Sequence, residues 1–245
     1  WAFCECSSLS NVMFAAESKL AVIGEGAFQY SALGSVTIPV SVTNIGTRAF
    51  CDCSSLSNVT MQAATPPTLG SDAFNEASND LKIHVPETSA AAYSAADNWR
   101  YYYQKLDPWG AGDGAWARLV DGVLTIDGAG VVDKIEWFGN YPWVDNKAEI
   151  FSVVVGKDIT GIGDDAFFPC EALSNITFAA ESKLAVIGEN AFRFSALGSV
   201  TIPASVTNIG SWAFSGCSSL SNITFAADSE LTEIGDNAFQ SCVSL

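Results

Sequence analysis

Apolar and polar residues alternate in short runs that return at regular intervals along the chain. In the run formed by Leu33, Val36 and Ile38, serine and threonine occupy the positions on either side of the valine. A period of two residues predicts a strand with one buried face and one solvated face. The same run begins again at Leu9, Leu56, Leu173, Leu197 and Leu220. One short strand is therefore expected in each of several similar turns.

An Ala-Phe pair precedes these runs and recurs in both halves of the chain. Its phenylalanines are Phe3, Phe28, Phe50, Phe74, Phe167, Phe192, Phe214 and Phe239, which are 22 to 25 residues apart within each half. A turn of this length cannot bury its apolar face alone, so the turns are expected to stack. Turns of roughly 20–29 residues with a leucine-rich strand indicate a leucine-rich repeat solenoid. Each phenylalanine is expected to fill the centre from the wall opposite the strand.

A longer unit has also been duplicated. Residues 14–24 are identical to residues 178–188, and residues 31–39 are identical to residues 195–203, with an offset of 164 in both cases. The short period is lost between the two copies. The chain is therefore expected to contain parts of two separate repeat arrays.

These breaks in the period suggest a division near Pro108. Residues 1–107 are expected to form the C-terminal part of a first array with a closing strand and a helix cap. Residues 108–245 are expected to form a β-hairpin cap followed by the start of a second array. The fold class is thus a repeat solenoid, α/β or mainly β, with two short stacks joined by a closing cap and an opening cap.

The closing segment is expected to consist of a strand and a helix. Residues 82–85 read as the last strand because they alternate and are followed by proline. The helix is expected to present one apolar face, which would hold Ala92, Ala96, Trp99 and Tyr103. Such a cap would cover the open end of the stack.

The opening segment carries a hairpin signal and a cluster of aromatic residues. Asp121 and Gly122 separate two alternating runs, which is a strong indication of a tight β-hairpin. Residues 150–155 read as a strand that leads into the second array. Between them lies a predicted aromatic loop made of Trp137, Phe138, Tyr141, Pro142 and Trp143.

The repeat motifs resemble the bacterial BspA-like (Treponema-type) leucine-rich repeat family. The resemblance rests on S-V-T-N-I-G at 41–46 and 205–210, on T-I-P at 37–39 and 201–203, and on A-F-x-x-C-x-x-L at 2–9, 49–56, 213–220 and 238–245. It covers roughly residues 1–85 and 150–245. It implies a solenoid that is secreted or held at the bacterial cell surface and that serves in adhesion to host matrix proteins or other cells.

Composition narrows the classes of partner. The net charge is −16, while only 16% of residues are charged and 49% are hydrophobic. A chain without a basic stripe cannot neutralise phosphates, which argues against nucleic acid. The same charge argues against an electrostatic membrane anchor. No apolar run approaches the ~18 residues that a membrane-spanning helix needs, so membrane insertion is not expected.

Seven cysteines raise the question of disulfides. Five of them follow the repeat phenylalanine by three residues and are expected to be buried as small apolar side chains: Cys6, Cys53, Cys170, Cys217 and Cys242. The rival interpretation is a disulfide, for which Cys217 and Cys242 in adjacent turns are the best placed. Their side chains should stack rather than face each other, so no bond is expected. Cys4 and Cys51 are expected to be more exposed.

Catalytic chemistry finds little support in the sequence. His84 is the one histidine, and no nucleophile is suggested beside it. Carboxylates such as Glu25, Asp164 and Glu189 follow Ile-Gly and fall at turn corners, where solvated residues are the default. We therefore expect a protein that is not an enzyme, with no cofactor and no metal site.

The outward face of the main sheet is the strongest candidate for binding. Because the valine and phenylalanine of each strand point inward, the residues between them must point outward. The outward set consists of Asn11, Ser35, Thr37, Asn58, Thr60, Asn175, Thr177, Ser199, Thr201, Asn222 and Thr224. The plainer interpretation is a soluble sheet face built of good strand formers. The functional one is a flat platform for a protein or a glycan, or, less readily, for ice.

Two aromatic residues form candidate anchors at the rim. Tyr30 and Phe194 lie two residues after a repeat phenylalanine, where other turns carry small or charged residues. Aromatic residues in such places can anchor an interface. Packing against a neighbouring turn is an equally good interpretation.

The leading hypothesis is a non-enzymatic extracellular module that binds a protein or glycan. The alternatives are a structural spacer of a tandem-repeat surface protein and an accessory domain of a larger secreted enzyme. Phe3, Leu9 and Val12 of the first turn are also expected to leave apolar surface open. End-to-end contact between copies of the chain through such terminal turns is a further expectation.

Overall fold

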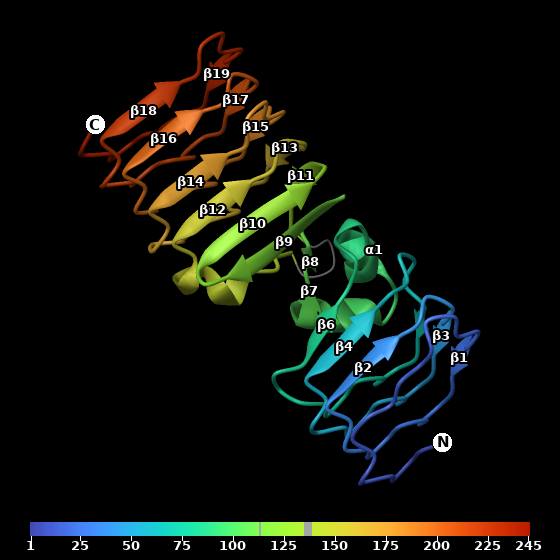
Figure 1. Cartoon of the computed structure of the whole chain (residues 1–245). Coiled ribbons are helices and arrows are strands. Elements are labelled where there is room, and N and C mark those ends of the chain that lie inside the picture. The colour runs from blue at the N-terminus through green and yellow to red at the C-terminus, as the bar shows by residue number, and fades with distance from the viewer. Residues whose placement is uncertain (113, 135–138) are drawn as a thin grey trace. The chain divides into compact units, whose positions relative to one another are not determined.

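The computed structural model describes residues 1–112, 114–134 and 139–245 and divides the chain into two compact units. Unit 1 is Trp1–Trp109 and unit 2 is Gly110–Leu245. Both are built from stacked turns, each of which contributes short strands to parallel sheets (Figure 1). The fold is thus a mainly β leucine-rich repeat solenoid. The predicted fold class is confirmed at this level.

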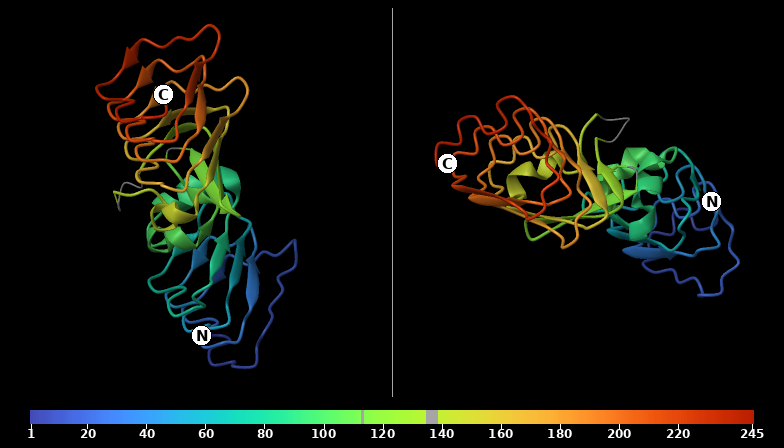
Figure 2. Two further views of the ribbon diagram at one scale, coloured as in Figure 1. Left: turned by 90° about the vertical axis from the view of Figure 1, so that its left-hand side faces the viewer. Right: turned by 90° about the horizontal axis from the view of Figure 1, so that it is seen from above.

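Each unit has a front sheet of longer strands and a rear sheet of shorter ones, as the two views of Figure 2 show. In unit 1, the front sheet consists of β2 (Ser35–Ile38), β4 (Asn58–Met61), β6 (Lys82–His84) and β7 (Leu106–Asp107). The rear sheet consists of β1 (Val22–Ile23), β3 (Asn44–Ile45) and β5 (Thr68–Leu69). Their ladders are all parallel because each strand comes from the same place in its turn.

Unit 2 repeats this plan and adds a hairpin. Its front strands are β9 (Ala115–Val120), β10 (Val123–Gly128), β12 (Ser152–Val155), β14 (Asn175–Phe178), β16 (Ser199–Ile202) and β18 (Asn222–Phe225). Its rear strands are β11 (Gly130–Val132), β13 (Ile159–Ile162), β15 (Val186–Ile187), β17 (Asn208–Ile209) and β19 (Glu233–Ile234). A 3₁₀ helix spans Val144–Glu149, and β8 (Trp109–Gly110) lies at the division between the units.

The hairpin joins β9 to β10 through Asp121 and Gly122, whose φ angles are +46° and +72°. Positive φ at both central residues is what a two-residue hairpin of this kind requires. β9 and β10 pair antiparallel, whereas β10 pairs with β12 in parallel. The hairpin therefore continues the front sheet beyond the first repeat turn of unit 2.

The end of unit 1 corrects one prediction. A short helix α1 (Ala90–Ala95) is followed by a 3₁₀ helix at Trp99–Lys105, so a single helical face does not form. Asn98 breaks the helical path with a φ of +63°. As a result, Ala92 is exposed, and Tyr93 is buried instead and donates its hydroxyl to the Ala63 carbonyl at 2.8 Å.

The repeat phenylalanines form a continuous stack through the core of each unit. In unit 1, the ring centroids of Phe3, Phe28, Phe50 and Phe74 are 5.2 to 5.4 Å apart. In unit 2, those of Phe167, Phe192, Phe214 and Phe239 are 5.1 to 5.3 Å apart. Neighbouring rings are nearly parallel, and an offset stack of this spacing is a favourable arrangement of aromatic rings.

Other aromatic residues extend both stacks. Trp143 stacks on Phe167 at 5.6 Å and Tyr141 on Trp143 at 5.1 Å, so two members of the predicted aromatic loop are core residues. Trp137 and Phe138, also assigned to that loop, lie outside the described residues. In unit 1, Tyr102 meets Phe74 edge to face at 5.5 Å.

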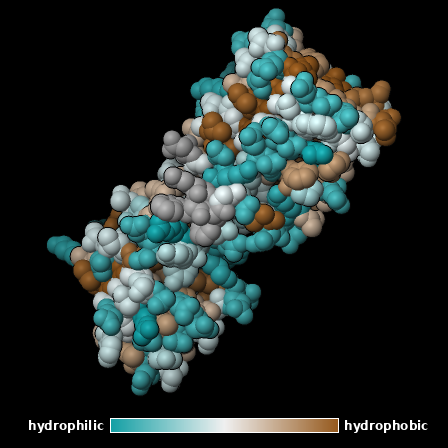
Figure 3. Space-filling model, turned by 180° about the vertical axis from the view of Figure 1, so that it is seen from behind, coloured by the Kyte–Doolittle hydropathy of each residue, from teal (hydrophilic) through white to brown (hydrophobic). Residues whose placement is uncertain are grey.

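The first turn is the least covered part of unit 1. Phe3 is 44% exposed, and Leu9 and Val12 are half-buried, in agreement with the expected open surface. Apolar residues also gather at the end of unit 2 that carries the last turn (Figure 3), where Phe225, Ile234 and Val243 are exposed. End-to-end contact between copies stays a prediction.

The phenylalanine stack gives the first testable prediction. Replacing Phe192 by alanine should lower the free energy of unfolding by about 3–5 kcal/mol, because its fully buried ring stacks on both neighbours. Phe3→Ala is the matched control, since its ring has one stacking neighbour and is partly exposed. Denaturant unfolding monitored by circular dichroism measures both. If both variants lost the same free energy of unfolding, stacking on two neighbouring rings would not be what stabilises the unit.

Candidate functional site

The outward residues of the front sheets are placed as their alternation predicts. In β2, β4 and β16, exposed and buried residues strictly alternate. The exposed set comprises Asn11, Ser35, Thr37, Asn58 and Thr60 in unit 1, and Asn175, Thr177, Ser199, Thr201, Asn222 and Thr224 in unit 2. The candidate face is therefore two surfaces, one on each unit, whose binding roles stay proposals.

In unit 1, one histidine joins this surface. The Nδ1 atom of His84 lies 3.0 Å from Oδ2 of Asp107, and its Nε2 atom lies 3.3 Å from Oδ1 of Asn58. Asp107 comes from β7, which pairs with β6 after the helical segment. The sequence did not reveal this contact, because the two residues are 23 positions apart across an irregular segment. The imidazole faces an amide rather than a nucleophile.

In unit 2, the hairpin widens the front surface. Arg118 of β9 pairs in register with Thr125, which in turn lies beside Val154 and then Thr177. The guanidinium of Arg118 lies 5.8 Å from the centroid of the Trp116 ring, a cation–π distance. Sequence reasoning assigned the hairpin but not these two side chains. The signal was the alternation of Ala and larger residues in β9.

The front sheet of unit 2 is interrupted between β14 and β16. Among the described residues, β14 pairs with β12 and β16 pairs with β18, but no ladder joins β14 to β16. The rear strands of the same two turns remain paired, since β15 pairs with β17. The Phe167 and Phe192 rings also stay stacked at 5.1 Å. We call this break the seam.

Pro203 provides a local reason for the seam. In neighbouring turns the residue after the strand donates its N–H to the turn before, as Ala179 does to Val155 at 2.9 Å and Ala226 to Ile202 at 3.0 Å. Pro203 occupies the equivalent position and has no N–H to donate. It therefore cannot close the end of β16 onto Phe178.

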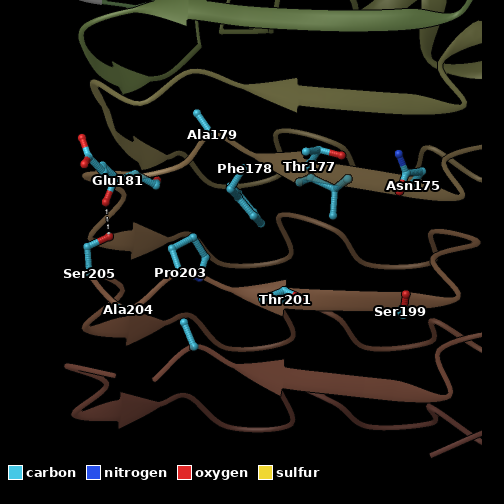
Figure 4. A pocket seen from close by; sticks show the side chains of 13 residues that line it. Asn175, Thr177, Phe178, Ala179, Glu181, Ser199, Thr201, Pro203, Ala204 and Ser205 are labelled. Atoms are coloured by element: carbon cyan, nitrogen blue, oxygen red, sulfur yellow. Dashed lines mark hydrogen bonds between the residues drawn. The ribbon is translucent and has the colours of Figure 1, made fainter. Parts of the chain in front are cut away.

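A groove of about 580 Å³ opens along the seam (Figure 4). This is within the usual range of roughly 300–1,000 Å³ for small-molecule sites. Four predicted face residues line it: Asn175 and Thr177 from β14, and Ser199 and Thr201 from β16. Phe178, Pro203 and alanines supply apolar surface, and Glu181 is the one charged residue among the described residues of the lining. Ser205 donates its hydroxyl to the Ser182 carbonyl at 2.8 Å on one wall.

The two rim aromatics lie at turn corners rather than on the front sheets. Phe194 packs over Gly216 of the next turn and is 45% exposed. The Arg193 guanidinium lies 4.8 Å from its ring and 5.1 Å from that of Trp212. Phe194 therefore belongs to a packed cation–aromatic cluster between turns.

Tyr30 occupies the corresponding corner in unit 1. It is 50% exposed, and the nearby Asp52 carboxylate raises the pKa of its phenol. Both corner residues have a φ of +61°, a conformation that most non-glycine residues avoid. Their roles as anchors stay a prediction.

Four of the seven cysteines follow prediction, and three require a correction. All seven are described and all are free. Cys53, Cys170, Cys217 and Cys242 are buried, and Cys217 donates its thiol to the Phe192 carbonyl at 3.2 Å.

The corrections concern Cys51, Cys6 and Cys4. Cys51 is 5% exposed rather than open, because its corner packs on the next turn and its thiol donates to Asp52 at 3.1 Å. Burial is the main reason that its pKa rises to about 12. Cys6 is exposed rather than buried. Cys4, which was also expected to be among the more exposed cysteines, is half-buried.

Neither metal binding nor membrane crossing is indicated by the described part of the chain. Within residues 1–112, 114–134 and 139–245, no group of three His, Cys, Asp or Glu side chains is arranged to hold a metal ion. Across the same ranges, no helix is both long and apolar enough to cross a lipid bilayer.

Stacked parallel strands joined by a buried phenylalanine column define a leucine-rich repeat protein. The family described as "BspA type Leucine rich repeat region" matches in six copies over residues 1–96 and 144–245, so the chain belongs to this family. No curated protein matches the sequence.

Two solved bacterial structures illustrate what the chain is similar to. A leucine rich cell surface protein from Faecalibacterium prausnitzii is 23% identical, with a TM-score of 0.42 over 92% of this chain and 50% of that one. A leucine-rich repeat protein from Bacteroides ovatus is 22% identical, with a TM-score of 0.46 over 99% of this chain and 67% of that one. The chain thus spans half the length of the first of these proteins.

Thiol accessibility gives the second prediction. In the native protein, Cys6 should react readily with a thiol reagent and Cys4 more slowly. Cys53, Cys170, Cys217 and Cys242 should be protected, because they are buried and the pKa of Cys170 rises to about 12. Mass spectrometry after brief alkylation at pH 8 identifies the labelled residues. Denatured protein, in which all seven should react, is the control, and rapid native labelling of Cys170 would contradict the packing.

Proposed function

We propose that the front sheet of unit 2 binds an extracellular protein or glycan, so that the chain acts as a non-enzymatic adhesion module. The observation that carries this proposal is the groove at the seam. Four uncharged polar side chains from two neighbouring strands line the groove together with apolar surface. Concave sites of this mixed lining are where proteins commonly take ligands.

The chemistry of the groove favours neutral, hydrogen-bonding ligands. Ser199, Thr177 and Thr201 offer hydroxyls, and Asn175 offers an amide, each of which can donate and accept hydrogen bonds. The chain carries a net charge of −16, yet only Glu181 brings charge to the described lining. Short-range hydrogen bonding rather than long-range attraction would therefore select the ligand.

A place at the cell surface is the setting we propose. Support comes from the family and from a relative that is described as a leucine rich cell surface protein. A structural spacer and an accessory domain of a larger secreted enzyme are the competing functions. Both predict that the groove itself is dispensable.

Lysine substitution tests the groove. A Thr177→Lys and Thr201→Lys double variant should fold normally but bind its ligand at least about tenfold more weakly, because the two ammonium groups would block the groove. Saturable binding to panels of matrix proteins and glycans, measured by biolayer interferometry, provides the readout.

The matched control is Thr37→Lys with Thr60→Lys, which changes the corresponding face of unit 1. Its binding should equal that of the unchanged protein. Undiminished binding by the unit 2 variant would remove the groove as the site. Failure of the unchanged chain to bind any member of either panel would favour the spacer.

A further inference from the structure

We propose that the groove at the seam binds a neutral glycan, whose sugar rings pack on Phe178 while their hydroxyls bond to the polar lining. This inference rests on the proposed function and names one class of ligand for the same site. Three features carry it: the shape of the groove beyond the strand ends, an aromatic side chain at a core position, and hydroxyls that no other described residue bonds.

The groove continues past the strand ends because the β16 turn has a short connection. The chain from the end of the front strand to the glycine after the rear strand covers residues 178–188 in the β14 turn and residues 225–235 in the β18 turn. In the β16 turn it covers residues 202–210 and is two residues shorter. The rear strands of all three turns stay in register, so the extra residues of the flanking turns must loop outward. The short connection becomes the floor of a recess.

All three connections contribute to the lining of this recess. The residues are Glu181 and Ser182 from the first, Pro203, Ala204 and Ser205 from the second, and Ala226 from the third. The floor is tied to both walls, because Ser205 donates its hydroxyl to the Leu184 carbonyl and the Glu230 N–H donates to the Ala204 carbonyl, each at 2.8 Å. Figure 4 shows Glu181 at one end of the groove and Asn175 at the other. The groove is therefore elongated and held open by the fold.

The two strands at the seam lie too close together for another strand to enter. Cα atoms of β14 and β16 approach within 8 Å of each other, whereas an inserted strand would need about 4.8 Å on either side. A ligand must therefore lie over the groove and bind through side chains. A glycan suits such a site, because it presents hydroxyls around its rings and needs no strand edge.

Phe178 supplies an aromatic surface where neighbouring turns have a buried aliphatic residue. Its ladder partner Val155 and the equivalent residue of the next turn, Ile202, are both fully buried. Phe178 is half-buried, lines the groove and points from β14 toward the β16 turn (Figure 4). The face of an aromatic ring carries negative charge density, which attracts the polarised C–H groups of a sugar ring. A sugar can therefore cover apolar surface that the core leaves open.

The hydroxyls on the two strands are free to bond a ligand. Within the described part of the chain, the side chains of Thr177, Ser199 and Thr201 form no hydrogen bond with the protein. By contrast, Thr207 and Ser221 outside the groove donate their hydroxyls to carbonyls of the turn before. A sugar hydroxyl can donate and accept, and so can these three side chains, so each can bond in the direction that the ligand requires.

Glu181 decides the charge of the ligand. Its carboxylate is exposed, and the nearest lysine in sequence, Lys183, is paired instead with Asp158 at 2.7 Å. Neither Lys nor Arg occurs in the described lining, and the chain carries a net charge of −16, so sulfated or sialylated glycans would be repelled. A carboxylate accepts hydroxyl hydrogens in short, charge-assisted bonds, and neutral sugars supply such donors.

Titration with defined sugars tests the inference. The probes are short linear oligosaccharides of glucose, galactose, mannose or N-acetylglucosamine, each with a sulfated counterpart, and isothermal titration calorimetry on the whole chain measures their affinities. At least one neutral oligosaccharide should bind, and its sulfated counterpart should bind about tenfold or more weakly. Equal or tighter binding of the sulfated sugar would overturn the proposal.

Two pairs of variants locate the ligand. Phe178→Leu keeps an apolar side chain but removes the ring, so affinity should fall about tenfold. Phe225→Leu makes the same change at the end of β18, outside the described lining, and should leave affinity unchanged. Glu181→Gln should weaken binding about fivefold or more, whereas Asp228→Asn at the equivalent position of the β18 turn should not. Unchanged affinity of both Phe178→Leu and Glu181→Gln would show that the sugar binds elsewhere.

A longer connection tests the shape of the site. Replacing residues 202–210 by the sequence of residues 178–188 lengthens the short turn by two residues, so the recess should fill and oligosaccharide binding should be lost. The same replacement of residues 38–46 in unit 1 is the matched control and should leave affinity unchanged. Circular dichroism verifies that both variants fold. Binding at full affinity by the folded unit 2 variant would contradict the proposed site.

The outcomes also distinguish this inference from the function on which it rests. If no neutral oligosaccharide binds, while a matrix protein binds and is lost in the Thr177→Lys and Thr201→Lys double variant, the glycan is wrong and the binding function stands. If oligosaccharides and matrix proteins all fail to bind, the proposed function is lost as well.

Discussion

The stacking of phenylalanine rings is the constraint on which the rest of the structure depends. Each ring lies 5.1 to 5.4 Å from the next, which is close to the spacing of neighbouring strands of about 4.8 Å. A turn that places its ring on the column therefore also brings its strands near pairing distance. Parallel strands in constant register follow from this match, and so does a front face on which equivalent residues form rows.

The seam shows how much freedom this constraint leaves. At β14 and β16 the ring column and the rear sheet remain intact, while the front sheet is interrupted. The ring column and the rear sheet still connect the two turns. The ladder of the front sheet can therefore be lost without unfolding. A missing donor at Pro203 is enough to remove a closing hydrogen bond, whose net worth is only about 1 kcal/mol. A solenoid can thus carry an open edge inside its sheet.

The sequence predicted the fold because its signals are local and repeated eight times. It also predicted which side chains point outward, since alternation alone decides that. The failures concern contacts that depend on one turn meeting another. Cys51 is buried by its neighbour's corner, and Asp107 reaches His84 across an irregular segment. Pro203 is visible in the sequence, but a proline at the end of a strand indicates an unpaired strand edge only once the neighbouring strand is known.

The duplicated sequence makes this dependence on context plain. Residues 31–39 and 195–203 are identical, including the T-I-P proline, yet only unit 2 shows the full seam. The difference comes from the preceding turn. β14 is held in a ladder with β12, which is itself held by the hairpin. In unit 1 the corresponding residue, Asn11, instead forms an isolated parallel bridge with Ser35. The groove therefore arises from the opposition of two anchored strands rather than from the proline alone.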